Sequence, residues 1–270
     1  MNSNNQIAQE PQGYSLAVCT LASGSKGNAT YISDGRTSIL IDAGLSGREI
    51  QRRLTSRGLD PAKLNAIIVS HEHSDHTRGV GILSRRFKLP VYINQNTHSG
   101  AAAEIGKAHE IRPFECGTSF NIRDLAVHPF SISHDAGDPA GFTVGSNGTR
   151  MAIATDMGIA TAMVKEHLKH CALLILEANH DPQMLETGPY PWPLKQRIQS
   201  RTGHLSNADS RKLLHELQHE KLQHVILAHI SEINNTPHKA LEEVSRALTR
   251  CRARLTVADQ YNSGPLIYLR

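Results

Sequence analysis

The sequence predicts a layered α/β protein, and three observations indicate this class. Hydrophobic residues make up 39% of the 270-residue chain and charged residues 20%, which is typical of a globular protein with a core. Short apolar runs rich in Val, Ile and Leu alternate with helical patterns along the chain. The chain contains no repeat of fixed period and no low-complexity linker. This order of elements fits either one mixed sheet or a sandwich of two sheets with helices outside.

We expect a disordered leader over residues 1–13 and a single domain over residues 14–270. The leader is polar and lacks an apolar segment, so it does not resemble a signal peptide. No apolar run approaches the roughly 20 residues that a membrane-spanning helix needs. The four cysteines include no Cys-x-x-Cys pair, which predicts reduced thiols in a reducing compartment. We therefore expect a cytoplasmic protein without a membrane partner.

The first half of the chain predicts an antiparallel start followed by alternating helices and strands. The dipeptide Asp34-Gly35 is a hairpin signal between two apolar runs. Ile50 and Leu54 share one face of an otherwise charged segment that Gly58 terminates, which predicts an amphipathic helix. We expect strands over 16–21, 29–33, 38–42, 66–70 and 91–94, and helices over 46–57, 79–87 and 97–106.

The second half predicts a strand-rich region and then alternating strands and helices. Ser206, followed by Asp209, is a helix-capping pattern, and Pro237 suits the first position of a helix. Three prolines between residues 187 and 193 predict an irregular segment. We expect strands over 125–133, 142–144, 151–156, 172–176, 225–228 and 266–269, and helices over 159–168, 194–201, 206–219 and 236–248.

Five of the predicted strands end on a side chain that can bind a metal ion. Ligands at strand ends converge when the strands end at one edge of a rigid sheet, because function is carried by the loops at that edge. The chain also holds 16 histidines, a surplus of the commonest metal-ligating residue. The five strand-end residues are Asp42, His71, His134, Asp156 and His229.

The strongest local signal is the string His71-x-His73-x-Asp75-His76. Alternate residues of an extended chain point in one direction, so His71 and His73 can bind one metal. Asp75 and His76 lie past the bend and can bind a second. Four potential ligands within six positions predict a metal site.

This string, together with the order of the ligands before and after it, resembles the metallo-β-lactamase fold superfamily from residue 16 to the C-terminus. The resemblance implies an α/β fold, the αββα four-layer sandwich, with two mixed sheets and outer helices. It also implies two divalent metal ions, Zn or Mn. His71, His73 and His134 would hold the first ion; Asp75, His76 and His229 would hold the second. Asp156 would bridge both, and Asp42 would support the site from behind the ligands.

Four further strings resemble one branch of the superfamily, the YycJ/WalJ group. They are SGSKGN (23–28), EANHD (177–181), PYPWPLKQR (189–197) and GHLSN (203–207). That group is regarded as DNA-processing, which implies a dinuclear phosphodiester hydrolase and most closely a DNA exonuclease acting 5′ to 3′. Glu177 and His204 also resemble, more loosely, strings of tRNA 3′-processing enzymes. An RNA- or tRNA-processing nuclease and a small-molecule hydrolase, of a cyclic phosphodiester or a thioester, remain the alternatives.

Three residues are expected to carry the catalysis. His204 would protonate the leaving oxygen or stabilise the transition state, and Glu177 would orient it through a carboxylate–histidine hydrogen bond. Asp75 is expected to be essential as well as a ligand. Two metals about 3.5–4 Å apart suit in-line hydrolysis of a phosphodiester.

The formal charge of +4 permits a polyanionic partner, and DNA is favoured over RNA. The expected substrate contacts are Ser25, Lys26, Asn28, His180, Lys195 and Arg197. The only tryptophan, Trp192, would either stack on a base or hold its loop against the core, and the second interpretation is favoured. Arg48, Arg52 and Arg53 are expected on a solvated helix face.

Overall fold

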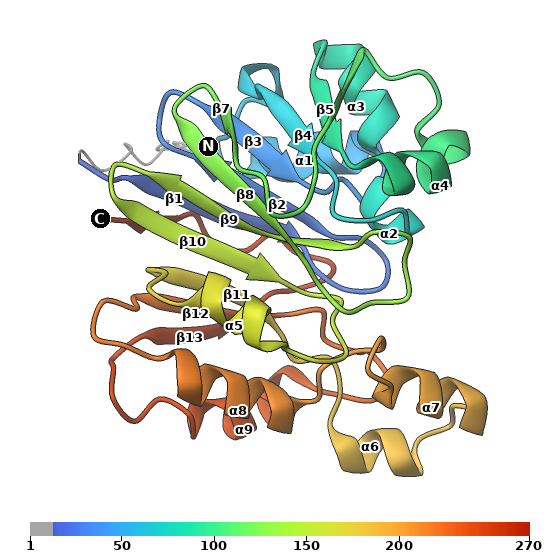
Figure 1. The fold of residues 1–270 in the computed structure, drawn as a ribbon, viewed down its shortest axis with the longest axis vertical. Helices are drawn as coiled ribbons and strands as arrows, with labels where there is room; N and C mark the ends of the chain where they lie inside the picture. Colours follow the sequence, from blue (N-terminus) through green and yellow to red (C-terminus); the bar gives the residue numbers. More distant parts are fainter. Residues whose placement is uncertain (1–12) are drawn as a thin grey trace, which may run out of the picture.

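Two mixed β-sheets stack face to face between layers of helices in the computed structural model, which describes residues 13–270 (Figure 1). The sequence left open one sheet or two, and the two-sheet sandwich that the resemblance implied is confirmed. Except for Gly13, the predicted leader lies outside the described residues. Within the described part, no helix is long and apolar enough to cross a membrane.

The first sheet has the strand order β14-β1-β2-β3-β4-β5-β6. Its antiparallel start is confirmed, because β1 pairs with β2 and β2 with β3 in antiparallel register. From β3 to β6 the pairing is parallel, and helices make the crossovers that parallel pairing requires. The strands are β1 (Leu16–Ala22), β2 (Ala29–Ser33), β3 (Ser38–Ile41), β4 (Ala66–Ile68), β5 (Pro90–Ile93), β6 (Glu110–Pro113) and β14 (Ile267–Leu269).

The second sheet repeats this plan in the order β13-β12-β11-β10-β9-β8-β7. β7 to β10 pair antiparallel, and β10 to β13 pair parallel. The strands are β7 (Phe120–Ile122), β8 (Leu125–Ser131), β9 (Ala140–Ser146), β10 (Thr149–Ala154), β11 (Leu173–Glu177), β12 (His224–Ala228) and β13 (Arg254–Val257).

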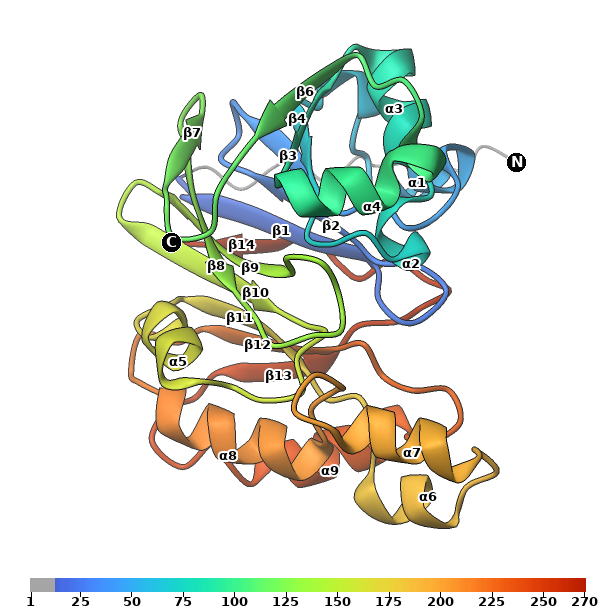
Figure 2. The ribbon, with the colours of Figure 1, turned by 45° about the vertical axis from the view of Figure 1, so that its right-hand side comes forward.

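Helices cover the outer face of each sheet, and a pair of short helices projects from one corner (Figures 1 and 2). Next to the first sheet lie α1 (Gly47–Ser56), α2 (Ser74–Thr77), α3 (Val80–Phe87) and α4 (Gln95–Ile105), with a 3-10 turn at Pro61–Lys63. Next to the second lie α5 (Ala162–Leu168), α8 (Asn207–Leu217) and α9 (Pro237–Ser245). The projecting pair, called the corner lobe below, is α6 (Pro182–Thr187) and α7 (Trp192–Gln199).

Three hydrophobic clusters hold these layers together. One lies between the two sheets, and one lies between each sheet and its helices. β11 is buried along its whole length because it is a central parallel strand covered on both faces. The same burial explains why its sequence is a continuous apolar run ending on Glu177. The apolar interior therefore fixes the strand ends from which the site is built.

Sequence reasoning missed β6, β13 and α6. β6 and β13 carry charged residues and are edge strands, so their pairing with β5 and β12 makes them strands, not an apolar pattern of their own. The segment expected to be irregular is partly helical: α6 ends at Thr187 and α7 begins at Trp192. Prolines at the first helical turn start these helices instead of breaking them.

Arg53 was expected on a solvated face, and that expectation is wrong. It is buried, and its guanidinium donates hydrogen bonds to the carbonyl oxygens of Leu21, at 2.8 Å, and Gln260, at 3.0 Å. A buried arginine is tolerated because these acceptors and Glu49 satisfy its donors.

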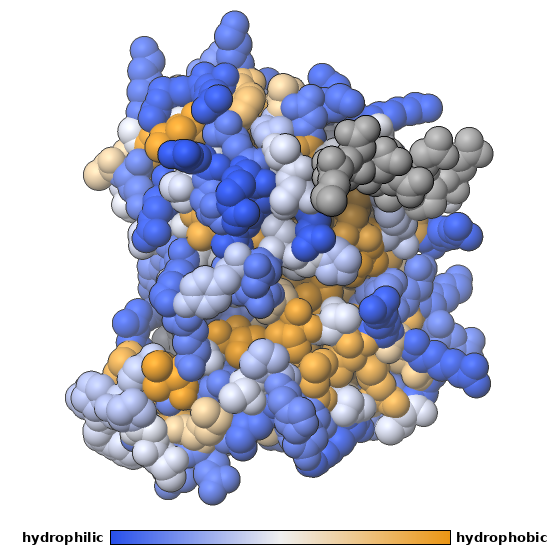
Figure 3. All heavy atoms as spheres, turned by 180° about the vertical axis from the view of Figure 1, so that it is seen from behind, coloured by the Kyte–Doolittle hydropathy of each residue, from blue (hydrophilic) through white to orange (hydrophobic). Residues whose placement is uncertain are grey.

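Seen from behind, hydrophilic residues cover most of the surface and a hydrophobic band crosses its lower half (Figure 3).

Candidate metal centre

The loops that follow β3, β4, β8, β10 and β12 all deliver side chains to one edge of the sandwich. Asp42 follows β3 directly, His229 follows β12 directly, and Asp156 comes two residues after β10. These three residues have positive φ values of 60°, 56° and 56° respectively. Such backbone is uncommon for residues other than glycine and concentrates at functional sites. It ends each strand abruptly at a potential ligand.

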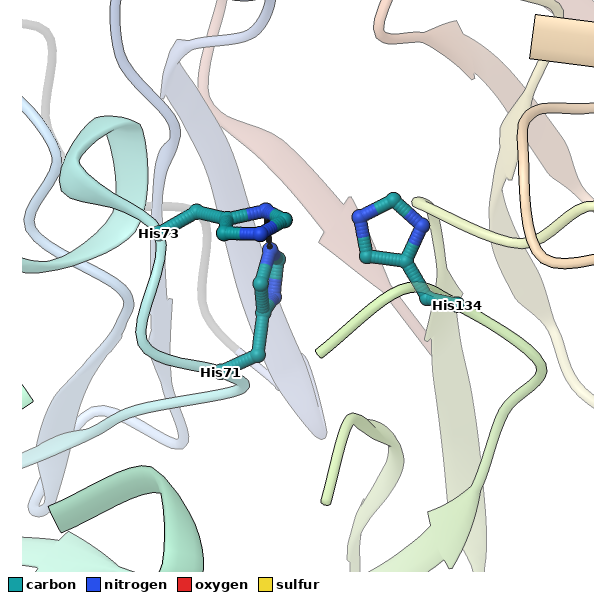
Figure 4. Close-up of side chains that lie close together, drawn as sticks. All are labelled: His71, His73 and His134. Atoms are coloured by element: carbon teal, nitrogen blue, oxygen red, sulfur yellow. Dashed lines mark hydrogen bonds between the residues drawn. The ribbon is translucent and has the colours of Figure 1, made fainter. Parts of the chain in front are cut away.

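His71, His73 and His134 form a first group of donors. Their ring nitrogens lie within 4.8 Å of one another, and His71 Nε2 is 3.1 Å from His73 Nδ1. Figure 4 shows His71 and His73 on one loop and His134 facing them from another. Burial first, and then the neighbouring imidazoles, hold the pKa of His71 well below its usual value. The ring is therefore neutral, which is the form that binds metals.

Asp75, His76, Asp156 and His229 form a second group. His76 Nε2 is 3.5 Å from both Asp75 Oδ2 and Asp156 Oδ2. His229 Nε2 is 3.8 Å from Asp75 Oδ2 and 3.4 Å from Asp156 Oδ1. Ligands of a tetrahedral zinc ion, with bonds of about 2.0–2.2 Å, lie about 3.3–3.6 Å apart. The second group therefore has the spacing of a metal site.

Unpaired buried atoms mark the space between the two groups. His134 Nε2, Asp156 Oδ2 and His229 Nε2 are buried and have no hydrogen-bond partner among the described residues. Leaving such atoms unpaired is costly, so buried polar groups are normally satisfied. Divalent ions would satisfy all three, and a set of imidazoles and carboxylates suits Zn or Mn. We call the seven residues of the two groups the histidine–aspartate cluster.

Asp42 lies behind the cluster and holds His76. Its Oδ2 is 2.8 Å from His76 Nδ1, so His76 Nε2 is left facing the cluster. Ser70 fixes Asp42 in turn, because its amide and its hydroxyl each donate to the carboxylate at 2.8 Å. Sequence reasoning missed Ser70, whose only signal was its place between β4 and His71. Such supporting contacts orient metal ligands.

The buried carboxylate of Glu177 lies between His204 and His229 and contacts both imidazoles. Its Oε1 accepts from His204 Nδ1 at 2.7 Å and lies 3.1 Å from His229 Nδ1. Its Oε2 accepts from the amides of Met157 and Leu205. Burial opposes the charge of His204, but the Glu177 carboxylate outweighs it and raises the pKa of His204. The link to His204 was expected, and the one to His229 was not.

Two residues that sequence reasoning missed clamp the strained backbone of His229. Ser23 Oγ accepts from the His229 amide at 2.8 Å. Asn179 Nδ2 donates to the His229 carbonyl oxygen at 2.9 Å. Both residues lie within strings that the sequence singled out, SGSKGN and EANHD, which was the available signal.

The expected substrate contacts are spread over different environments. Ser25 and Arg197 line a cavity of about 220 Å³ that also includes His204 and His229. Arg197 pairs with Asp135 at 2.5 Å. Lys26 is exposed, but its Nζ is 2.8 Å from Glu232, so part of its charge is already neutralised.

Asn28, His180 and Lys195 are placed away from the surface, contrary to their expected role. Asn28 is buried, and its Nδ2 donates to Asp75 Oδ2 at 3.1 Å, so it supports a ligand. His180 is 3% exposed, and its backbone forms an isolated parallel β-bridge with Ser206. Lys195 is 9% exposed, and its Nζ donates to the Glu186 carbonyl oxygen at 2.7 Å. The ammonium of Lys195 is thus used to tie α7 to α6.

The favoured expectation, that Trp192 holds its loop against the core, is wrong. It is 64% exposed at the first turn of α7, so the hydrophobic effect gains little from it in this position.

A family model described as "Beta-lactamase superfamily domain" matches residues 37–230. The chain belongs to the metallo-β-lactamase superfamily, and with its buried histidine and aspartate groups it is a metal-dependent hydrolase. Exodeoxyribonuclease YycJ of Bacillus anthracis is 36% identical over 86% of this chain and 89% of that protein. Exodeoxyribonuclease WalJ of Streptococcus pneumoniae is 35% identical over 80% of this chain and 81% of that protein.

Among solved structures, the metallo-β-lactamase fold protein YhfI of Bacillus subtilis superimposes with a TM-score of 0.73. The match covers 94% of this chain and all of that chain at 16% identity, so it speaks for the fold alone. The resemblance seen in the sequence, to the superfamily and to its YycJ/WalJ group, is confirmed.

Proposed function

We propose that this protein is a DNA exonuclease that uses two divalent metal ions, Zn or Mn. The observation that carries the proposal is the position of Asp156 between two groups of donors. One carboxylate oxygen is 3.5 Å from His76, the other is 3.4 Å from His229, and Asp156 also groups with His71. A carboxylate so placed suits a bridge between two ions. The names of the two bacterial relatives support DNA as the substrate.

In this proposal His71, His73 and His134 hold one ion, and Asp75, His76 and His229 hold the other. Two such ions lower the pKa of a water molecule and neutralise charge that develops on the phosphate oxygens. Asp42 and Glu177 fix the imidazoles through Nδ1, so that each Nε2 stays directed into the site.

His204 is the proposed general acid. Its Nδ1 is held by Glu177 at 2.7 Å, which leaves Nε2 to give a proton to the leaving oxygen of the cleaved phosphodiester. The 5′-to-3′ direction follows the YycJ/WalJ group that the sequence resembles. Ser25 and Arg197, at the adjacent cavity, are proposed contacts to DNA. Lys26, which pairs with Glu232 of the cavity lining, is a third.

The test combines metal analysis with cleavage of end-labelled DNA. We expect close to two ions per chain and stepwise release of nucleotides from the 5′ end with Zn or Mn. His73→Ala should abolish cleavage without loss of the fold, because the core lies elsewhere. His204→Ala should lower turnover by about 10²–10⁴-fold with both ions retained.

Each alternative gives a different result in the same assay. An RNA-processing enzyme would cut RNA and leave DNA intact. A small-molecule hydrolase would turn over a thioester or cyclic phosphate and leave both nucleic acids uncut. Binding of DNA should weaken steeply as salt rises, because phosphate contacts release counterions. Absence of stoichiometric metal after reconstitution would refute the proposal.

A further inference from the structure

A cavity of about 220 Å³ opens directly beside the histidine–aspartate cluster, and its lining has two parts. The polar part includes His204, His229, Asn179 and Arg197. It also includes Ser25, Ser231 and two carboxylates that are already paired, Asp135 with Arg197 and Glu232 with Lys26. Chemistry on a phosphodiester accounts for these groups, since they are charged or hydrogen-bonding. It does not account for the aromatic and aliphatic side chains in the same lining.

The apolar part comes from two segments that are distant in the sequence. Tyr190, Leu194 and Ile198 come from α7 and the residues just before it, in the corner lobe (Figure 2). Ile230 and Ile233 come from the loop after β12. The reaction centre therefore lies next to a space with hydrophobic side chains on two sides.

Ile233 is 46% exposed although it is a large aliphatic residue. A single exposed aliphatic residue is ordinary, but Ile233 shares one concave lining with Leu194 and Ile198, and apolar residues grouped in this way mark ligand-binding grooves. Tyr190, on the lobe side, adds an aromatic ring to the lining, and Trp192, two residues further along, is exposed but is not part of the lining. A ligand with a flat apolar part would bury these surfaces and gain hydrophobic free energy.

The size of the cavity restricts that ligand. Pockets for drug-sized molecules measure about 300–1,000 Å³, so 220 Å³ suits one nucleoside and not a base pair or an oligonucleotide. A nucleoside combines a flat apolar base with a polar sugar, which matches the two parts of the lining.

We propose that this cavity binds the terminal nucleoside of a DNA strand, with its base unpaired, while the phosphate to be cleaved lies at the histidine–aspartate cluster. This inference rests on the proposed function and adds the specificity element of the same site. The base contacts Leu194, Ile198 and Ile233, and Arg197 lies on the polar side. A cavity for one nucleoside is the element that an enzyme removing single nucleotides from an end requires.

The first experiment compares DNA ends that carry a normal terminal nucleotide with ends whose terminal sugar lacks a base. We expect kcat/KM about tenfold higher for the normal end, since stacking and burial of one base is worth roughly that factor or more. Ile233→Asp should move this ratio toward one, because it places a charge in the apolar wall. Ile233→Ala, which only removes apolar area, should have a smaller effect in the same direction.

Met163→Asp is the matched control. Met163 is 53% exposed on α5, which lies on the left of Figure 2 whereas the corner lobe lies on the right, and it does not line this cavity. This variant should keep the ratio of the unchanged protein. If Ile233→Asp and Met163→Asp lower the kcat/KM ratio of normal to base-free ends equally, the inference is overturned.

The second experiment measures binding without turnover. Trp192, the only tryptophan, lies between Tyr190 and Leu194 in sequence and reports on the corner lobe by fluorescence. A deoxynucleoside 5′-monophosphate should change this fluorescence saturably, and deoxyribose 5-phosphate should bind at least about tenfold more weakly. Ile233→Asp should weaken binding of the nucleotide, and Met163→Asp should not.

Failure of this inference and failure of the proposed function are distinguishable. Equal cleavage of normal and base-free ends overturns the cavity assignment and leaves the exonuclease in place. No cleavage of DNA, combined with nucleotide binding that depends on Ile233, refutes the exonuclease and supports the cavity assignment. Equal affinity for the deoxynucleoside 5′-monophosphate and for deoxyribose 5-phosphate in the fluorescence experiment also overturns the cavity assignment.

Discussion

Glu177 shows how much of the site depends on a single buried carboxylate. Each of its oxygens is committed: Oε1 faces the Nδ1 atoms of His204 and His229, and Oε2 accepts from two backbone amides. Its pKa is lowered, because the two imidazoles outweigh the burial that opposes its charge. No neutral side chain can accept four such hydrogen bonds, since an amide supplies donors at one of the two positions.

Glu177→Gln should therefore disturb both imidazoles at once. We expect metal affinity to fall about 10–100-fold and turnover to fall with it, because residues that orient metal ligands have effects of this size. Metal titration and kcat measure the two effects. Glu216→Gln, at an exposed position on α8, is the control and should change neither. Unchanged metal affinity in Glu177→Gln would show that the carboxylate does not orient His229.

His180 makes a prediction about pH. Burial is the main cause that lowers the pKa of this imidazole to about 4, so it stays neutral in the folded protein while the unfolded chain takes up a proton near pH 6.5. A lowered folded-state pKa favours folding above pH 6.5, and this contribution is lost as the pH falls toward 4.

Replacing His180 with Gln should remove that pH dependence. Between pH 7 and pH 5 the unchanged protein should lose about 2 kcal/mol more of its free energy of unfolding than His180→Gln does. The loss accumulates over the roughly 1.5 pH units from pH 6.5 to pH 5, where only the unfolded chain takes up the proton. Urea unfolding at the two pH values measures the difference. Identical losses in both proteins would mean that His180 is not held neutral.

At the scale of elements, the corner lobe buries few side chains, namely Leu185 of α6 and Lys195 of α7. α6 and α7 are short, and Lys195 ties them by donating to the last turn of α6 at the Glu186 carbonyl. At its far end, α7 is tied to the loop after β8 by the pair of Arg197 and Asp135. Elements with few buried contacts open locally at low free energy.

Lys195→Met should loosen this lobe without unfolding the molecule. The substitution leaves the Glu186 carbonyl without its donor, so amide hydrogen exchange over residues 182–199 should become faster. The overall melting temperature should stay nearly unchanged. Lys212→Met, at an exposed site on α8, is the control. Unchanged exchange in the lobe would show that the Lys195 hydrogen bond does not hold it.

For the whole molecule, the two sheets contribute different residues to the histidine–aspartate cluster, so metal binding there should link them. A ligand at 1,000 times its Kd stabilises the folded state by about 4 kcal/mol. For a chain of this size each kcal/mol shifts Tm by roughly 2–4 °C. The histidine–aspartate cluster is therefore expected to couple metal loading to global stability.

Chelation should lower Tm by about 10 °C, and excess Zn or Mn should restore it. Thermal unfolding with and without chelator measures the shift, and His73→Ala should reduce it because one donor is lost. A melting temperature independent of added metal would contradict a site that bridges the two sheets.

The sequence alone predicted the residues of the histidine–aspartate cluster and the central strands. Buried parallel strands must be continuous apolar runs, and the ligand-type residues at their ends stand out because a polar residue interrupts such a run. His71, His73, Asp75 and His76 also lie close enough along the chain to be grouped without a structure. These features depend on residues that are close together in the chain, so the sequence pattern alone predicts them.

The tertiary structure alone decided which side chains near the histidine–aspartate cluster are exposed and which are buried. Lys195, Asn28 and His180 are residue types that often contact a substrate, but packing buries all three. Lys195 and Asn28 use their polar atoms on Glu186 and Asp75 instead. The edge strands β6 and β13 exist through pairing with neighbours, and the apolar cavity joins α7 to the loop after β12. Burial and partnership depend on residues that are distant in the chain, so no local pattern encodes them.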